Sequence, residues 1–135
     1  MTLAAHDPKE PTMKWHTLAL IMLSVSLSAL AQIVLKYGMS SVQAQRALVD
    51  NKLSGLAIIA TSPHVLFGFA LYGLGAVLWL GVLARIEVSQ AYPFVGLGFL
   101  MTMAFAIAFL GEAFSIPRLA GSLLITAGVV LVARS

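Results

Sequence analysis

Long apolar runs separated by short polar breaks dominate the chain. The runs cover residues 15–36, 64–84, 91–111 and 117–133. A helix rises about 1.5 Å per residue, so about 20 residues span the roughly 30 Å hydrocarbon core of a bilayer. The pattern therefore predicts an all-α membrane protein with four transmembrane helices in a domain over residues 15–134.

Two segments lie outside these spans. Residues 1–14 are polar, and we expect a disordered tail there. Residues 39–62 carry apolar positions at helical spacing, among them Val42, Val49 and Leu56. Two interpretations are open: an amphipathic helix between the first two spans that lies in the membrane interface, or an extension of the next span.

The connections predict how the spans are arranged. The turn over residues 85–90 is short, so we expect the second and third spans to be antiparallel neighbours. Pro93 lies near the start of the third predicted span, where proline begins or kinks a helix. Four short helices enclose little space, so a transport path would need two copies of the chain or a related subunit.

Composition supports lipid as the solvent. Hydrophobic residues make up 60% of the 135 residues and charged residues 10%, whereas a soluble domain carries about 25% charge. The net charge of +3 is scattered, which predicts contact with membrane lipids and no nucleic-acid partner.

The Lys and Arg residues do not choose an orientation in the membrane. The N-terminal side carries Lys9, Lys14, Arg85 and Arg134, and the opposite side carries Lys36, Arg46, Lys52 and Arg118. Because loops rich in Lys and Arg normally stay in the cytoplasm, this balance is compatible with insertion in both orientations.

A polar stripe follows the first predicted helix. Ser24, Ser28, Gln32 and Lys36 are each four residues apart, so they share one helix face. Polar side chains within spans usually face other helices or water, and we interpret the stripe as the wall of a substrate cavity. Alternatively, the serines bond backbone carbonyls and Lys36 reaches the headgroups.

The acidic residues argue against a proton-coupled exporter of cations. Such an exporter needs a carboxylate inside the bilayer, and the first span has neither Asp nor Glu. An anionic or zwitterionic substrate fits better, with Lys36 and Arg118 as partners of a phosphate. Glu112 is the strongest acidic candidate, either paired with Arg118 or exposed at a loop. Tyr92 either lines the cavity near one interface or belongs to an aromatic belt.

The last span carries a glycine face. Gly121 and Gly128 are seven residues apart, and small residues let helices approach closely, so this face predicts a dimer contact or packing within one chain. The sequence contains no catalytic constellation, no nucleotide loop and no histidines at metal-ligand spacing. We therefore expect neither an enzyme nor a metal or cofactor.

Several short motifs resemble the drug/metabolite transporter superfamily. They are Leu78-Trp79-Leu80, Ala91-Tyr92-Pro93, Leu110-Gly111-Glu112, Pro117-Arg118 and the stretch from Gly121 to Gly128. The four-helix members of this superfamily include the small multidrug resistance proteins and the subunits of the aminoarabinose-phosphoundecaprenol flippase. The Gln32-x-x-x-Lys36 pair and Ala91-Tyr92-Pro93 are similar to the flippase subunits.

This resemblance implies a function. The small multidrug resistance pattern places an essential glutamate where this chain has Ser28, which argues against drug/proton antiport. The resemblance implies a multi-pass, dimeric protein of the bacterial inner membrane that translocates a polyprenyl-phosphate-linked sugar or a related anionic lipid by alternating access. Two alternatives stay open, a small multidrug or polyamine exporter and a non-transporting membrane subunit or scaffold.

Overall fold

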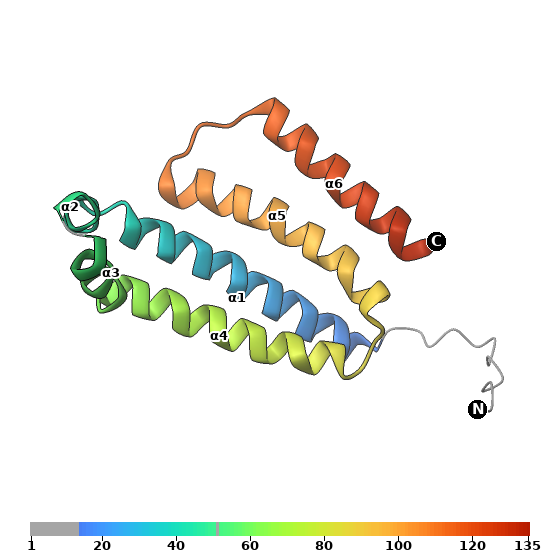
Figure 1. The fold of residues 1–135 in the computed structure, drawn as a ribbon. Coiled ribbons are helices and arrows are strands. Elements are labelled where there is room, and N and C mark those ends of the chain that lie inside the picture. Colours follow the sequence, from blue (N-terminus) through green and yellow to red (C-terminus); the bar gives the residue numbers. More distant parts are fainter. Residues whose placement is uncertain (1–13, 51) are drawn as a thin grey trace.

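The computed structural model describes residues 14–50 and 52–135, which are helical apart from short connections. The predicted tail over residues 1–14 lies outside the described residues except for Lys14. The helices shown in Figure 1 are α1 (Trp15–Met39), α2 (Val42–Asp50), α3 (Lys52–Ala60), α4 (Pro63–Leu83), α5 (Val88–Leu110) and α6 (Ile116–Arg134).

The all-α membrane class agrees with these helices. Within the described ranges, α1, α4 and α5 are long and apolar enough to cross a membrane, and α6 has a shorter apolar stretch, Ile116–Val132. Three of the four predicted spans therefore have the length that crossing requires. A crossing by α6 stays a prediction.

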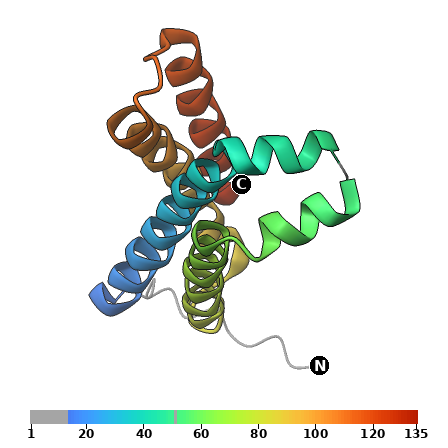
Figure 2. The same cartoon turned by 90° about the vertical axis from the view of Figure 1, so that its left-hand side faces the viewer.

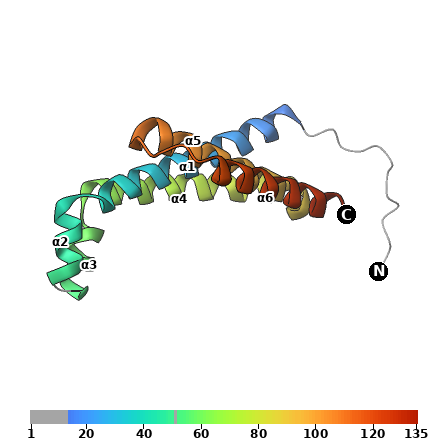
Figure 3. The ribbon, with the colours of Figure 1, turned by 90° about the horizontal axis from the view of Figure 1, so that it is seen from above.

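Both interpretations of segment 39–62 expected one continuous helix, and the structure does not contain one there. The segment folds into α2 and α3, which pack against each other and connect the end of α1 to the start of α4. Figures 2 and 3 show that both short helices run across the direction of the long ones. Gly55 permits this hairpin, because a Cβ at that position would collide with the backbone carbonyl of Ala47.

The long helices lie side by side in the order α4, α1, α5, α6, as Figure 1 shows. The expectation that the second and third spans are neighbours is therefore wrong for most of their length. A short turn joins α4 to α5, but α1 lies between them and makes the extensive contacts with both. A turn limits only the distance between the two ends that it joins, and packing places the rest of each helix.

Helix α1 packs closely on α4 because small residues of α4 face it. A Cβ on Gly68 would lie 2.7 Å from Cγ of Leu35, and one on Gly75 would lie 2.8 Å from Oγ of Ser28. The buried Ser24 donates a hydrogen bond from Oγ to the carbonyl of Gly75 at 2.7 Å. These contacts allow α1 and α4 to approach as membrane helices with small interface residues do.

Helix α6 is held against α5 and is displaced along it. Thr126 donates from Oγ1 to the carbonyl of Gly96 at 3.2 Å, and a Cβ on Gly96 would meet Thr126 at 3.0 Å. Helix α5 ends at Gly111, whose φ of 65° suits glycine. Pro93 lies inside α5 rather than at its start, because the helix begins at Val88.

Candidate functional site

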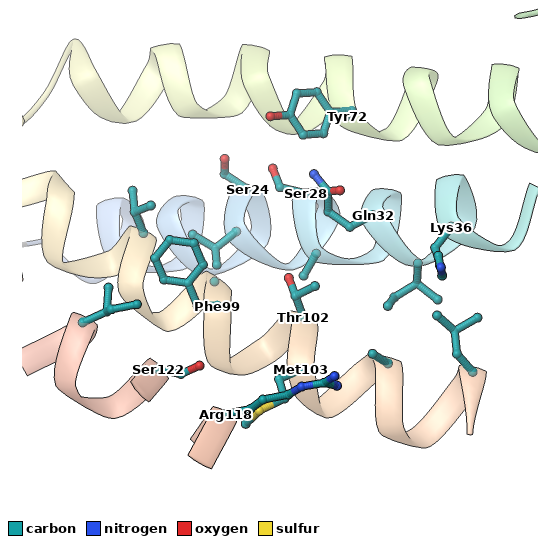
Figure 4. Close-up of a pocket in the computed structure, with 18 of the residues that line it drawn as sticks. Ser24, Ser28, Gln32, Lys36, Tyr72, Phe99, Thr102, Met103, Arg118 and Ser122 are labelled. Atoms are coloured by element: carbon teal, nitrogen blue, oxygen red, sulfur yellow. The ribbon is translucent and has the colours of Figure 1, made fainter. Parts of the chain in front are cut away.

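A cavity of about 940 Å³ is lined by residues of α1, α4, α5 and α6, and its size is typical of small-molecule sites. Figure 4 shows side chains from all four helices around it. Its polar and charged lining residues are Ser24, Ser28, Gln32, Lys36, Tyr72, Thr102, Glu112, Arg118 and Ser122. Its larger apolar lining residues include Trp79, Val95, Phe99, Met103 and Ile125.

The polar stripe of α1 forms one wall of this cavity. Ser28 is partly exposed, and Gln32 and Lys36 are exposed, so their polar ends are available to a bound molecule. Ser24 differs, because it is buried and its hydroxyl is bonded to the backbone of α4. The stripe thus combines a structural residue at one end with three residues that face the cavity.

The structure brings together most of the other predicted substrate residues. Glu112 and Arg118 lie in the lining, although they follow α1 by more than seventy residues in the chain. Tyr92 lies outside the lining, in the first turns of α5, where its side chain is 56% exposed. The cavity therefore holds Ser28, Gln32 and Lys36 together with Glu112 and Arg118.

Three polar lining residues were not singled out from the sequence as site candidates. Tyr72, Thr102 and Ser122 are isolated polar side chains in the apolar runs of α4, α5 and α6. Tyr72 and Thr102 have no polar neighbour at helical spacing, whereas Ser122 lies four residues after Arg118 and four before Thr126, a spacing that indicates one face of α6. Only the packing shows that all three face the same space. The interruption of an apolar run by a hydroxyl is the one signal that they share.

Positive charge exceeds negative charge in the lining. Lys36 and Arg118 are its cations, and Glu112 is its carboxylate. Among the described residues no carboxylate approaches either cation within the 4.0 Å of an ion pair. A lysine or arginine at the centre of a membrane helix costs roughly 2.5–3.5 kcal/mol by insertion scales. Lys36 and Arg118 lie near helix ends, where the cost is smaller, and they still favour an anionic partner in the cavity.

The register of the helices gives the position of Arg118 along the helix axes relative to Lys36. Thr126 of α6 lies beside Gly96 of α5, and the two helices are antiparallel. Arg118 lies eight residues before Thr126, so it is level with the α5 residue eight positions after Gly96, residue 104. A Cβ on Gly98 would contact Val25, so residue 104 is level with residue 31 of α1. Arg118 therefore lies about 7 Å, or five residues, further from the α2–α3 end than Lys36.

The glycine face of α6 is not used for packing within the described chain. A Cβ on Gly121 or on Gly128 would meet nothing within 4 Å. Gly121 lines the cavity and Gly128 is exposed. Packing within one chain therefore does not explain the glycine spacing, and the face is free for another helix.

No residues for a metal site gather in the described ranges, where no three His, Cys, Asp or Glu side chains come together. The long apolar helices and the open, cation-bearing cavity between them define the class of the protein: a small multi-pass membrane protein with a cavity among its helices.

Relatives identify the family within this class. The chain is 33% identical to the "Probable 4-amino-4-deoxy-L-arabinose-phosphoundecaprenol flippase subunit ArnE" of Pseudomonas paraeruginosa, over 86% of this chain and 96% of the relative. It is 34% identical to the probable flippase subunit ArnF of Erwinia tasmaniensis, over 81% of this chain and 87% of the relative. The uncharacterized protein y4nH of Sinorhizobium fredii is 32% identical to this chain, over 79% of this chain and 86% of the relative.

The chain therefore belongs to the family of the ArnE and ArnF flippase subunits. No family model and no solved structure matches it. The family agrees with the resemblance seen in the sequence motifs. Both the ArnE and the ArnF relative are named as subunits of a flippase.

Proposed function

We propose that this chain is a subunit of an inner-membrane flippase that translocates a polyprenyl-phosphate-linked sugar or a related anionic lipid. The observation that carries the proposal is the placement of Lys36 and Arg118, from opposite ends of the chain, in one cavity with the polar face of α1. The names of the relatives support a lipid-linked sugar as the substrate.

The cavity lowers the cost of moving a charged headgroup through hydrocarbon. A phosphate without partners loses its hydration there, whereas Lys36 and Arg118 supply charge-assisted hydrogen bonds, bidentate in the case of arginine. Ser28 and Gln32 offer hydroxyl and amide groups to a sugar along the same wall. The protein transports and catalyses no reaction of its own, because the headgroup only exchanges water for these side chains.

Alternating access is the mechanism that we propose, with α6 as the fourth membrane span. The four helices lie in series and leave the cavity open, so a second subunit is needed to close it. The free face around Gly121 and Gly128 offers a contact for that subunit. The partner is a second copy of the chain or a related subunit.

Native mass spectrometry of the protein extracted gently from its own membrane tests the proposal. We expect a dimeric complex that retains a polyprenyl-phosphate mass, and loss of that mass in Lys36→Ala and Arg118→Ala. Lys14→Ala and Arg46→Ala are matched controls, because both residues are exposed and lie outside the cavity. Retention of the lipid by both cavity variants would refute the role of the cations, and a complex with an unrelated chain would favour a scaffold.

A second function, export of cationic drugs or polyamines, is favoured by one observation. Glu112 lies in the cavity lining, where it is half-buried and could hold a proton or a cation in turn. Under this function, dye efflux from vesicles would depend on pH and would be lost in Glu112→Gln. Efflux that is absent in the wild type excludes the exporter and leaves the flippase.

A further inference from the structure

The cavity is graded along its length. Lys36 lies at the end nearest α2 and α3, and Figure 4 shows Arg118, Gln32 and Ser28 further along. Phe99 lies at the opposite end from Lys36. The lining thus carries its cations, Lys36 and Arg118, on the side toward α2 and α3, and larger apolar side chains, with Ser122 among them, toward the Phe99 end.

The apolar end is built from all four long helices. Its members are Val25 of α1, Trp79 of α4, Val95 and Phe99 of α5 and Ile125 of α6. Val25 and Lys36 are eleven residues apart in α1, so this end begins about 16 Å from the lysine. Ser24 adds no free polar group there, because its hydroxyl is bonded to Gly75.

The side chains that α5 and α6 contribute to this end are exposed, whereas Val25 is buried and Trp79 is partly buried against the core. Phe99 is 48% exposed, and Val95 and Ile125 are also exposed. Figure 4 shows the ring of Phe99 directed into the space beside the α1 stripe. The same space continues to the cations, so one molecule with an anionic end and an apolar chain matches the lining throughout.

We infer that the apolar end binds the part of the lipid chain next to the phosphate, with Phe99 as its principal contact. This inference rests on the proposed function and adds a second binding element to it. The first isoprenoid units lie inside the protein against Phe99, Val95 and Ile125, and only the distal chain extends into the bilayer. Chain chemistry next to the phosphate therefore contributes to substrate selection.

The grading also sets the direction of the bound lipid. The phosphate lies toward the α2–α3 end and the chain points away from it, as in a lipid of the leaflet on that side.

Binding measurements on the full chain in nanodiscs of zwitterionic lipid test the inference, with inorganic phosphate and farnesyl phosphate as probes. We expect Phe99→Ala to weaken farnesyl phosphate about tenfold, since it removes contact with roughly two methylene groups, and to leave inorganic phosphate unchanged. Phe109→Ala is the matched control, an exposed phenylalanine of the same helix outside the cavity, and should bind both probes as the wild type does.

Photolabelling gives a second measurement if Phe99→Ala does not fold. A farnesyl phosphate with a diazirine on its first isoprenoid unit should label the wild type near Phe99 and Ile125. Labelling confined to other surfaces would overturn the inference, as would binding of farnesyl phosphate by Phe99→Ala equal to that of the wild type. In either case, binding that depends on Lys36 would still support the flippase. A change in subunit number in Phe99→Ala would assign this end to a second copy and also overturn it. Absence of binding for both probes instead contradicts the proposed function itself.

Discussion

The packing of α1 on α4 makes a strong prediction for Gly75→Ala. The added Cβ would lie 2.8 Å from Oγ of Ser28 and 3.2 Å from the carbonyl oxygen of Ser24. Because backbone atoms of α1 are involved, a rotamer change cannot relieve both contacts. The two helices must separate, which also lengthens the 2.7 Å hydrogen bond from Ser24 to the carbonyl of Gly75.

The expected cost follows from these two effects. Overpacking of a well-packed contact costs about 1–3 kcal/mol. Loss of an interhelical hydrogen bond in a membrane protein costs about 0.6–1.7 kcal/mol. Alanine favours a helix over glycine by about 0.8–1 kcal/mol, which opposes both. Gly75→Ala should therefore lower the free energy of unfolding by about 1–4 kcal/mol.

Gly73→Ala is the matched control. It makes the same substitution two residues earlier in α4, and its Cβ would meet nothing within 4 Å. The gain in helix propensity cancels when the two variants are compared, so their difference reports the contact with α1. The free energy of unfolding is measured by steric trapping in bicelles. Equal stability of Gly75→Ala and Gly73→Ala would refute the close packing described for these helices.

Three further predictions concern α5 and α6. Thr126→Val removes the bonds to the carbonyls of Gly96 and Ser122 and should destabilise the chain by about 0.6–1.7 kcal/mol in the same unfolding assay; no loss would contradict the packing of α6 on α5. Gly111→Ala should cost about 1–2 kcal/mol, because alanine disfavours a φ of 65° and no side chain is near; stability equal to wild type would show that the backbone there is not left-handed. Gly128→Leu should leave subunit stability unchanged, because its Cβ has no neighbour in the described chain, but should shift native mass spectra from dimer to monomer; an unchanged dimer would exclude this face as the contact.

Much of the candidate site could be predicted from one helix. The spacing of Ser28, Gln32 and Lys36 follows from 3.6 residues per turn, so their common face is independent of the rest of the fold. Glu112 and Arg118 were predicted from their charge in an apolar chain, not from a known location. Tyr72 was missed because a single polar aromatic residue in an apolar run has no periodicity that assigns it to a face.

Segment 39–62 shows where periodicity misleads. Its apolar positions have helical spacing over the whole segment, yet the structure contains two helices packed as a hairpin. Gly55 permits the close approach of α3 to the carbonyl of Ala47 in that hairpin. A continuous helix would hold these two residues, eight apart in the chain, about 12 Å apart along its axis.

The local properties of this protein follow from its sequence alone: which runs are long and apolar enough for a membrane, that they are helical, and which α1 residues share a face. These follow from hydrogen bonding within a helix and from transfer of side chains into lipid, which depend on nearby residues alone. The packing of the helices determines three further relations: α1 separates α4 from α5, Arg118 lies further from the α2–α3 end than Lys36, and Phe99 lines the same cavity as both. Those relations depend on the packing of Gly68, Gly75 and Gly96 against other helices, because the closest approach of two surfaces is set by both of them together.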